Sequence, residues 1–280
     1  KAYDPKFAEK APKTFKCAEA KGKEFAGMKF TVQVAPEDCT GCAACVLNCP
    51  VEEKDANKQP TGRKAINMAL QEPLRMNERD NFNYFLSIPD TDPNKYKLNA
   101  VKGSQLVPAL FEFSGACAGC GETAYVKLLS QLFGDRALIA NATGCSSIYG
   151  GNLPTTPYTK RPDGLGPAWS NSLFEDNAEY GLGMRLAVNK FKGFAAELLD
   201  KVAAAGCVDK ALAEEIKAGL NTQKEQAGIE AQRTRVDKLK AACSKSDCAD
   251  CKQLLTVADY LVEKSRSEEH TSELQSRITI

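Results

Sequence analysis

Histidine is nearly missing from this sequence, since His270 is the only one among 280 residues. One histidine in a polar tail leaves no basis for a Ser–His–Asp triad, a Cys–His pair or a histidine-rich metal site. Long apolar runs are also missing, because no stretch approaches the ~20 apolar residues of a membrane span. The first residues lack both the apolar core of a signal peptide and a starting methionine, so we expect the natural chain to begin earlier.

Neither sign of charge dominates, because 37 basic and 36 acidic residues leave a net charge of +1. This balance argues against nucleic acid or a membrane surface as the main partner. Apolar residues at 43% and charged residues at 26% are typical of a soluble protein. Twelve cysteines are many for this length. Without a secretion signal, they predict metal or cluster binding in a reducing cytoplasm rather than disulfides.

The strongest motif is the cysteine run at residues 39–50, which reads CTGCAACVLNCP. Its C-x2-C-x2-C-x3-C-P spacing is that of a [4Fe–4S] ligand run, whose fourth cysteine binds the other cluster in two-cluster ferredoxins. We therefore expect Cys39, Cys42 and Cys45 to share one cluster and Cys49 to bind a second. A zinc knuckle is the alternative, but zinc sites favour two separated C-x2-C pairs.

Further cysteines fall into two groups and two isolated positions. Cys117 and Cys120 form a C-x2-C pair that could be a redox dithiol, while Cys145 follows an apolar run and could supply a third cluster ligand. Cys243, Cys248 and Cys251 have the first part of a plant-type [2Fe–2S] spacing, but no later cysteine completes it. The simpler interpretation is that these cysteines are small residues near a helix end. The cysteines without an assigned role are Cys17, Cys207, Cys243, Cys248 and Cys251.

The chain divides into several expected segments. Residues 1–27 form a connecting segment, 28–70 a partial ferredoxin-like domain, 71–104 a polar linker and 105–265 a truncated second domain with a helical region over 171–264. Within the first domain we expect alternating Phe30, Val32 and Val34 to form a strand, with 65–68 as a partner strand and a polar loop over 52–63.

In the second domain, helical spacing of Tyr125, Leu128, Leu129 and Leu132 predicts an amphipathic helix. The apolar run at 137–140 predicts a buried parallel strand. The predicted fold class is therefore α/β, with a parallel-sheet domain preceded by a small α+β iron–sulfur domain. Such sheets bind ligands at the carboxyl ends of their strands.

Three longer motifs carry a family resemblance. They read SGACAGCGET at 114–123, ANATGCSSIYG at 140–150 and GPAWSNSLFEDN at 166–177. With the cysteine run, they make the chain from about Phe30 to Ser265 resemble part of pyruvate:ferredoxin (flavodoxin) oxidoreductase. Ala43 stands where that family more often has glycine, and we expect this small residue to be tolerated.

The resemblance implies a thiamine-diphosphate-binding type of parallel-sheet domain. It implies that Cys117, Cys120 and Cys145 bind the cluster nearest the thiamine, and that Glu122 and the Cys145 loop contact the cofactor. For Glu122 the simple alternative is a carboxylate that stabilises the first turn of a helix. The fourth ligand of this cluster and the ligands of Mg²⁺ are expected outside this sequence.

The implied reaction is oxidative decarboxylation of pyruvate with coenzyme A to acetyl-CoA and CO2. Electrons would pass through [4Fe–4S] clusters to ferredoxin or flavodoxin, in a full-length protein expected to be a cytoplasmic homodimer. This chain alone is expected to have no turnover with pyruvate. Alternatives are another 2-oxo acid as substrate, a free-standing iron–sulfur electron carrier, or a zinc-stabilised binding module.

Residues 266–280 differ from everything before them. Their RSEEHTSELQS run is similar to the translation of a common sequencing-library adapter, and a natural polar tail is the alternative. We expect the natural sequence to depart from this one near Ser265 and to continue into a Gly-Asp-Gly segment whose aspartate holds Mg²⁺ and the diphosphate.

Overall fold

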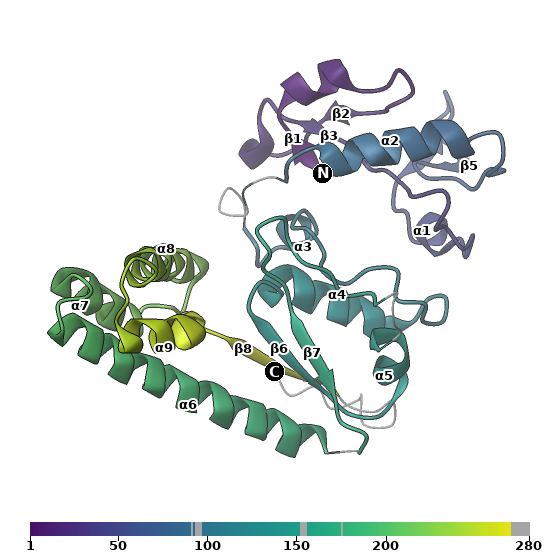
Figure 1. Cartoon of the computed structure of the whole chain (residues 1–280). Coiled ribbons are helices and arrows are strands. Elements are labelled where there is room, and N and C mark those ends of the chain that lie inside the picture. Colours follow the sequence, from purple (N-terminus) through teal and green to yellow (C-terminus); the bar gives the residue numbers. More distant parts are fainter. Residues whose placement is uncertain (91, 93–96, 152–155, 175, 270–280) are drawn as a thin grey trace. The chain divides into compact units, whose positions relative to one another are not determined.

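The computed structural model describes residues 1–90, 92, 97–151, 156–174 and 176–269 (Figure 1). The chain divides into two compact units, Lys1–Leu132 and Phe133–Ile280. The domain boundaries expected from sequence stay a prediction.

The first unit begins with a small antiparallel sheet of very short strands. These are β1 (Ala2–Tyr3), β2 (Ala18–Glu19) and β3 (Lys29–Phe30), in the order β1-β3-β2. Two 3-10 helices, η1 (Pro5–Lys10) and η2 (Lys23–Phe25), connect them. The sheet is accompanied by buried side chains that include Phe25 and Phe15. Residues 1–27, expected only to connect, therefore contribute strands and core.

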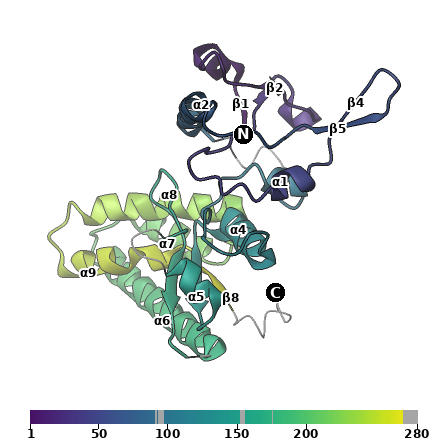
Figure 2. The ribbon, with the colours of Figure 1, turned by 90° about the vertical axis from the view of Figure 1, so that its right-hand side faces the viewer.

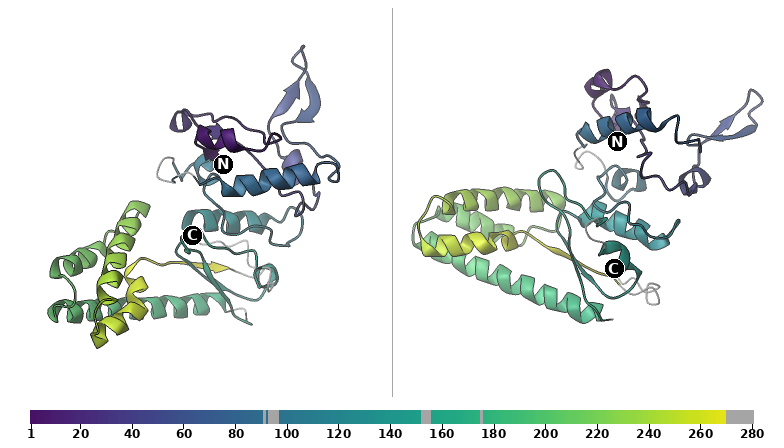
Figure 3. Two further views of the ribbon diagram at one scale, coloured as in Figure 1. Left: turned by 45° about the horizontal axis from the view of Figure 1, so that its top comes forward. Right: turned by 45° about the vertical axis from the view of Figure 1, so that its right-hand side comes forward.

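Three predictions in this unit differ from the structure, and one of them is the partner strand expected at residues 65–68, which do not form a strand. The strand expected around Phe30 ends at that residue, and Val32 and Val34 are 58% and 49% exposed. The expected loop over 52–63 contains instead a hairpin of β4 (Glu52–Lys54) and β5 (Pro60–Lys64), the narrow ribbon in Figure 3. Nearly all hairpin residues are exposed, so no apolar alternation marked it in the sequence.

Helices account for much of the rest of the first unit. They are α1 (Ala44–Leu47), α2 (Arg75–Ser87), α3 (Val101–Ser104) and α4 (Gly121–Phe133). Helix α2 lies in the expected linker, and the adjoining Ile88 is buried with Tyr3 and Phe15. The predicted helix over 121–133 is confirmed, although its most buried positions are Val126 and Ser130 and Tyr125 is exposed.

The second unit is built on a parallel sheet. Its strands are β6 (Ala137–Asn141), β7 (Ala168–Asn171) and β8 (Ser265–Glu269), in the order β7-β6-β8. The central strand is β6, which confirms the buried parallel strand predicted there. The backbone of β8 includes the first residues of the expected adapter segment, whereas residues 270–280 lie outside the described part of the chain.

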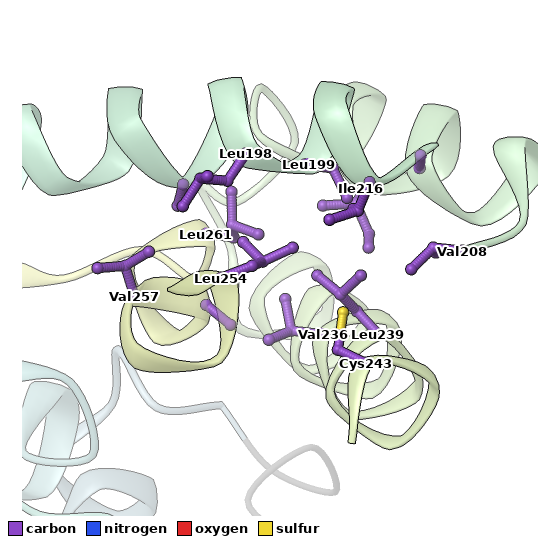
Figure 4. Close-up of a cluster of buried hydrophobic side chains, with 14 of the residues drawn as sticks. Leu198, Leu199, Val208, Ile216, Val236, Leu239, Cys243, Leu254, Val257 and Leu261 are labelled. Atoms are coloured by element: carbon purple, nitrogen blue, oxygen red, sulfur yellow. The ribbon is translucent and has the colours of Figure 1, made fainter. Parts of the chain in front are cut away.

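The predicted helical region is confirmed and packs around one apolar core. Its elements are α6 (Asn177–Ala204), α7 (Lys210–Gly219), α8 (Gln226–Cys243), α9 (Ala249–Val257) and η4 (Ala258–Leu261). Figure 2 shows α6, α8 and α9 together, and Figure 4 shows Leu198, Leu239 and Leu254 meeting between them. Within the described residues, no helix combines the length and apolarity needed to cross a membrane.

Candidate functional site

The predicted cluster loop lies on the surface of the first unit. Cys39, Cys42 and Cys45 are all exposed, and Cys49 is half-buried. The loop turns tightly, because Gly41 and Ala43 have φ angles of +72° and +59° before helix α1 begins. The short helix places Cys45 on its first turn. The first three thiols therefore lie on one solvent-accessible loop, where they could bind a cluster at the surface of the unit.

The backbone around Cys49 favours its thiolate. Hydrogen bonding from the backbone of Val51 lowers the pKa of the Cys49 thiol, against a smaller opposing effect of desolvation. The backbone of Ile66 and Ala65 and the Lys64 ammonium group add to the lowering. The thiolate is the form of cysteine that binds metal. The backbone and the ammonium group at the end of β5 therefore favour Cys49 as a metal ligand.

Replacing Ala43 with glycine is expected to stabilise the cluster loop. Alanine in the left-handed region costs roughly 1–2 kcal/mol, a cost that glycine avoids. Glycine also gives the unfolded chain more conformational freedom, which offsets roughly 0.4–1 kcal/mol of this stabilisation. A net stabilisation of the loop by about 0.5–1 kcal/mol corresponds to about two- to fivefold slower amide hydrogen exchange. The measurement is hydrogen exchange of the amides of residues 46–49, which donate within this turn.

The matched control for this prediction is Ala44→Gly. Ala44 is the first residue of α1, where glycine costs a helix roughly 0.5–1 kcal/mol instead. Ala43→Gly should therefore slow hydrogen exchange of these amides, and Ala44→Gly should accelerate it. Equal changes in exchange for both variants would show that the positive φ of Ala43 does not destabilise the loop.

The Cys117–Cys120 pair lies in a tight turn at the start of α4. The amide of Cys120 donates to the Cys117 carbonyl at 3.0 Å, and Gly119 between them has φ +74°. The hydroxyl of Thr123 donates to the Cys120 carbonyl at 3.0 Å. Cys120 immediately precedes the first residue of the helix. Glu122 lies in its first turn, the position that the simple structural alternative predicts.

Cys145 is the first residue of α5 (Cys145–Gly150), in the loop that follows the central strand β6 of the second unit. Its thiol is exposed. The loop lies at the carboxyl ends of β6 and β7, the edge where open parallel sheets bind ligands. The ligand role expected for Cys145 stays a prediction.

A buried amide network fixes this loop. The Nδ2 group of Asn141 donates to Asn171 Oδ1 at 2.7 Å and to Ser147 Oγ at 3.0 Å, and Ser146 Oγ donates to Asn141 Oδ1 at 2.6 Å. The hydroxyl of Ser147 donates to the Ala142 carbonyl at 2.8 Å. The sequence prediction assigned no role to these residues individually. The signal that could have found them is an asparagine at the end of each paired strand.

The predicted ligand sets remain predictions as sets. Cys117 and Cys120 belong to the first unit and Cys145 to the second. Among the described residues, the group whose ligand atoms lie within 4.8 Å of one another is instead Cys207, Cys248 and Cys251. The sequence prediction missed this group, because Cys207 lies far from the other two along the chain.

Comparison with known proteins places the chain in a family, although no family model matches it. It is 56% identical over 271 residues to a pyruvate-flavodoxin oxidoreductase of Nostoc sp. and 44% identical over 265 residues to that of Rhodospirillum rubrum. These matches cover 95% and 94% of this chain. It is also 53% identical over 180 residues, 64% of the chain, to the pyruvate:ferredoxin oxidoreductase of Moorella thermoacetica.

The matched segment is a limited part of each relative. The chain spans 22% of the length of the Nostoc and Rhodospirillum proteins and 14% of the Moorella protein. Within that segment, identity near one half extends along almost the whole chain for the two flavodoxin-linked enzymes. The chain therefore belongs to the pyruvate-flavodoxin oxidoreductase family and corresponds to part of such an enzyme.

Proposed function

We propose that this chain is the electron-transfer and cofactor-contacting part of an enzyme that oxidatively decarboxylates pyruvate with coenzyme A. Its electrons would pass through [4Fe–4S] clusters to ferredoxin or flavodoxin in the cytoplasm, in a full-length homodimer. The observation that carries this proposal is the accessible cysteine loop at 39–49 in a chain similar to pyruvate-flavodoxin oxidoreductases. The activity belongs to the whole protein, of which this chain is one segment.

The donor set of this loop fits an iron–sulfur cluster. Cys39, Cys42 and Cys45 offer soft thiolates only, and their exposure leaves room for a cluster outside the fold. Such a cluster accepts and releases single electrons when bound. The thiol of Cys49, favoured as a thiolate by its backbone neighbours, would serve a second cluster. The chain's role here is to hold the electron carriers without reacting itself.

The Cys117, Cys120 and Cys145 thiols are proposed ligands of the cluster nearest to thiamine diphosphate. Thiamine diphosphate stabilises the carbanion left by decarboxylation. The loop of Cys145 is suited to positioning because Asn141 and Ser147 hold it at the ligand-binding edge of the sheet. Glu122 would contact the cofactor from the start of α4. Mg²⁺ would be held by residues outside this sequence.

Anaerobic reconstitution with iron and sulfide tests the cluster proposal on this chain. The reconstituted chain should show cluster absorbance and an EPR signal after reduction, and Cys42→Ser should lower bound iron by about four atoms per chain, the content of one cubane. Cys17→Ser is the matched control, since Cys17 is also an exposed cysteine but lies outside every proposed ligand set. An unchanged iron content in Cys42→Ser would refute the assignment.

The same experiment distinguishes the alternatives. Zinc without cluster absorbance would favour a zinc-stabilised binding module. In the full-length protein, clusters whose EPR signal stays the same after thiamine diphosphate is added would favour a free-standing electron carrier. A response to thiamine diphosphate that disappears in Cys145→Ser would support the enzyme proposal, because Cys145 links the cluster and cofactor sites in it.

A further inference from the structure

Four cysteines meet in the helical part of the second unit, away from every ligand proposed above. The sulfur atoms of Cys207, Cys248 and Cys251 all lie within 4.8 Å of one another. Cys243 lies in the same buried core cluster as Cys251, and Cys207 and Cys248 pack against that cluster. Cys243 and Cys251 are 1% and 0% exposed, so this side of the group is closed by the helical core (Figure 4).

Each thiol comes from the end of a helix. Cys207 follows α6 after Gly206, whose φ of +72° turns the chain back so that the Cys207 amide donates to the Val202 carbonyl at 3.0 Å. Cys243 is the last residue of α8. Cys248 is the N-cap of α9, and Cys251 lies in its first turn. The end of α6 and the start of α9 thus bring three sulfurs together, and the end of α8 places Cys243 in the same core cluster as Cys251.

The backbone around Cys248 is arranged for a metal-bound thiolate. Cys248 caps α9 with backbone angles of φ −56° and ψ 131°, and Cys251 follows it by one turn. The Ser246 hydroxyl accepts from the Cys248 amide at 3.2 Å. A C-x2-C pair at a helix N-terminus has the usual zinc-ligand spacing.

The spacing of the sulfur atoms selects the kind of metal centre. Four thiolates at ~2.3 Å from one zinc ion lie about 3.8 Å apart in a tetrahedron. Three sulfurs already within 4.8 Å of one another need little movement to reach that arrangement. A [4Fe–4S] cubane binds each thiolate on a different iron, which holds the sulfurs farther apart. Thiolates prefer soft or borderline metals, so calcium and magnesium are excluded.

We propose that Cys207, Cys243, Cys248 and Cys251 form a structural zinc site with four thiolate ligands that ties the ends of α6 and α8 to the start of α9. All four positions are filled by protein, which is typical of structural rather than catalytic zinc. The site takes part in neither electron transfer nor cofactor contact. It accounts for four of the cysteines to which the oxidoreductase assignment gives no role.

Residue-resolved alkylation of the unmodified 280-residue chain tests the site. The chain is reduced and stripped with a chelator, then labelled with iodoacetamide with or without one equivalent of zinc, and each cysteine is followed by peptide mass spectrometry. Zinc should slow labelling of Cys207 and Cys248, the half-buried members, at least tenfold, whereas exposed Cys17 should label equally in both samples. Equal rates at Cys207 and Cys248 with and without zinc would overturn the proposal.

Cobalt binding provides the second measurement. Co²⁺ in a tetrahedral thiolate site gives strong visible absorption, which the parent chain and Cys17→Ser should show and Cys248→Ser should lose. Because the cluster-loop cysteines could also bind cobalt, both variants are compared in a Cys39→Ser, Cys42→Ser, Cys45→Ser background. Three results would each contradict the zinc site. They are a full cobalt spectrum in Cys248→Ser, iron bound at these four cysteines, and a native disulfide among them.

Discussion

Replacing Asp135 with asparagine is expected to cost the second unit ~3–5 kcal/mol of its free energy of unfolding, the range for breaking a buried ion pair. The Asp135 side chain is 8% exposed, and its carboxylate lies 2.8 Å from Arg136 and 2.8 Å from Arg233. Arg161 lies 3.9 Å away, and Gln226 donates at 3.3 Å. Without the aspartate charge, the buried Arg136 guanidinium group loses its ion-pair partner, and Arg233 keeps only Glu230, whose side chain is 43% exposed.

The measurement is urea unfolding followed by the fluorescence of Trp169, the only tryptophan, which lies on β7 of the same unit. Asp163→Asn is the matched control. Asp163 pairs with Arg161 at 2.8 Å, but its side chain is 43% exposed, and exposed pairs contribute only about 0–1 kcal/mol. A similar small loss for both variants would show that Asp135 is not the centre of a buried charge network.

The same carboxylate should make the stability of the second unit depend on acid. Burial alone would raise the pKa of Asp135, but Arg136, Arg233 and Gln226 together outweigh it and hold this pKa below its usual range. A lowered folded-state pKa means that the stabilisation is complete above the unfolded value of about 4 and is lost as pH falls through the folded value. Asp135→Asn should therefore flatten the loss of stability below pH 4, whereas Asp163→Asn should not.

Local sequence patterns predicted the elements whose signals lie within a few residues. The apolar run at 137–140 formed a buried central strand, and the periodic helix over 121–133 formed with nearly the expected bounds. The hairpin β4–β5 was missed because its residues are polar and exposed. Helix α2 was taken as linker because Pro73 and Pro89 flank it and its residues are mostly polar, while burial of Asn81 depends on Thr14 far away in the chain.

For the candidate site too, only the part with a local sequence signal could be predicted. The spacing of Cys39, Cys42 and Cys45 carries its own chemistry, so the sequence sufficed to single out that loop. Cys207 carried no such signal, because its approach to Cys248 depends on how α6, α8 and α9 pack. Long-range packing of this kind has no local pattern, and one isolated cysteine is indistinguishable from an ordinary small buried residue.

Replacing Asn141 with alanine is expected to loosen the Cys145 loop and to destabilise the second unit. Asn141 is fully buried, and its removal leaves the buried Ser146 hydroxyl without its acceptor, whereas Asn171 Oδ1 loses one donor and keeps the Ser147 hydroxyl at 2.9 Å. Buried polar groups left unsatisfied cost about 1–3 kcal/mol, so we expect a loss of ~2–3 kcal/mol. Hydrogen exchange of the amides of residues 142–147 should then accelerate about 30- to 150-fold.

The comparison that isolates this network is Asn189→Ala. Asn189 is exposed on α6 of the same unit, so the same change of residue type there should alter exchange at 142–147 by less than about twofold, in keeping with the small effects of surface substitutions. Because Cys145 lies within the affected segment, the Asn141 variant should also assemble the thiamine-proximal cluster less completely while leaving the cluster at residues 39–45 unchanged. Unaltered exchange at 142–147 would mean that the hydrogen bonds of Asn141 do not hold the loop, and that the edge of the sheet positions Cys145 through backbone pairing alone.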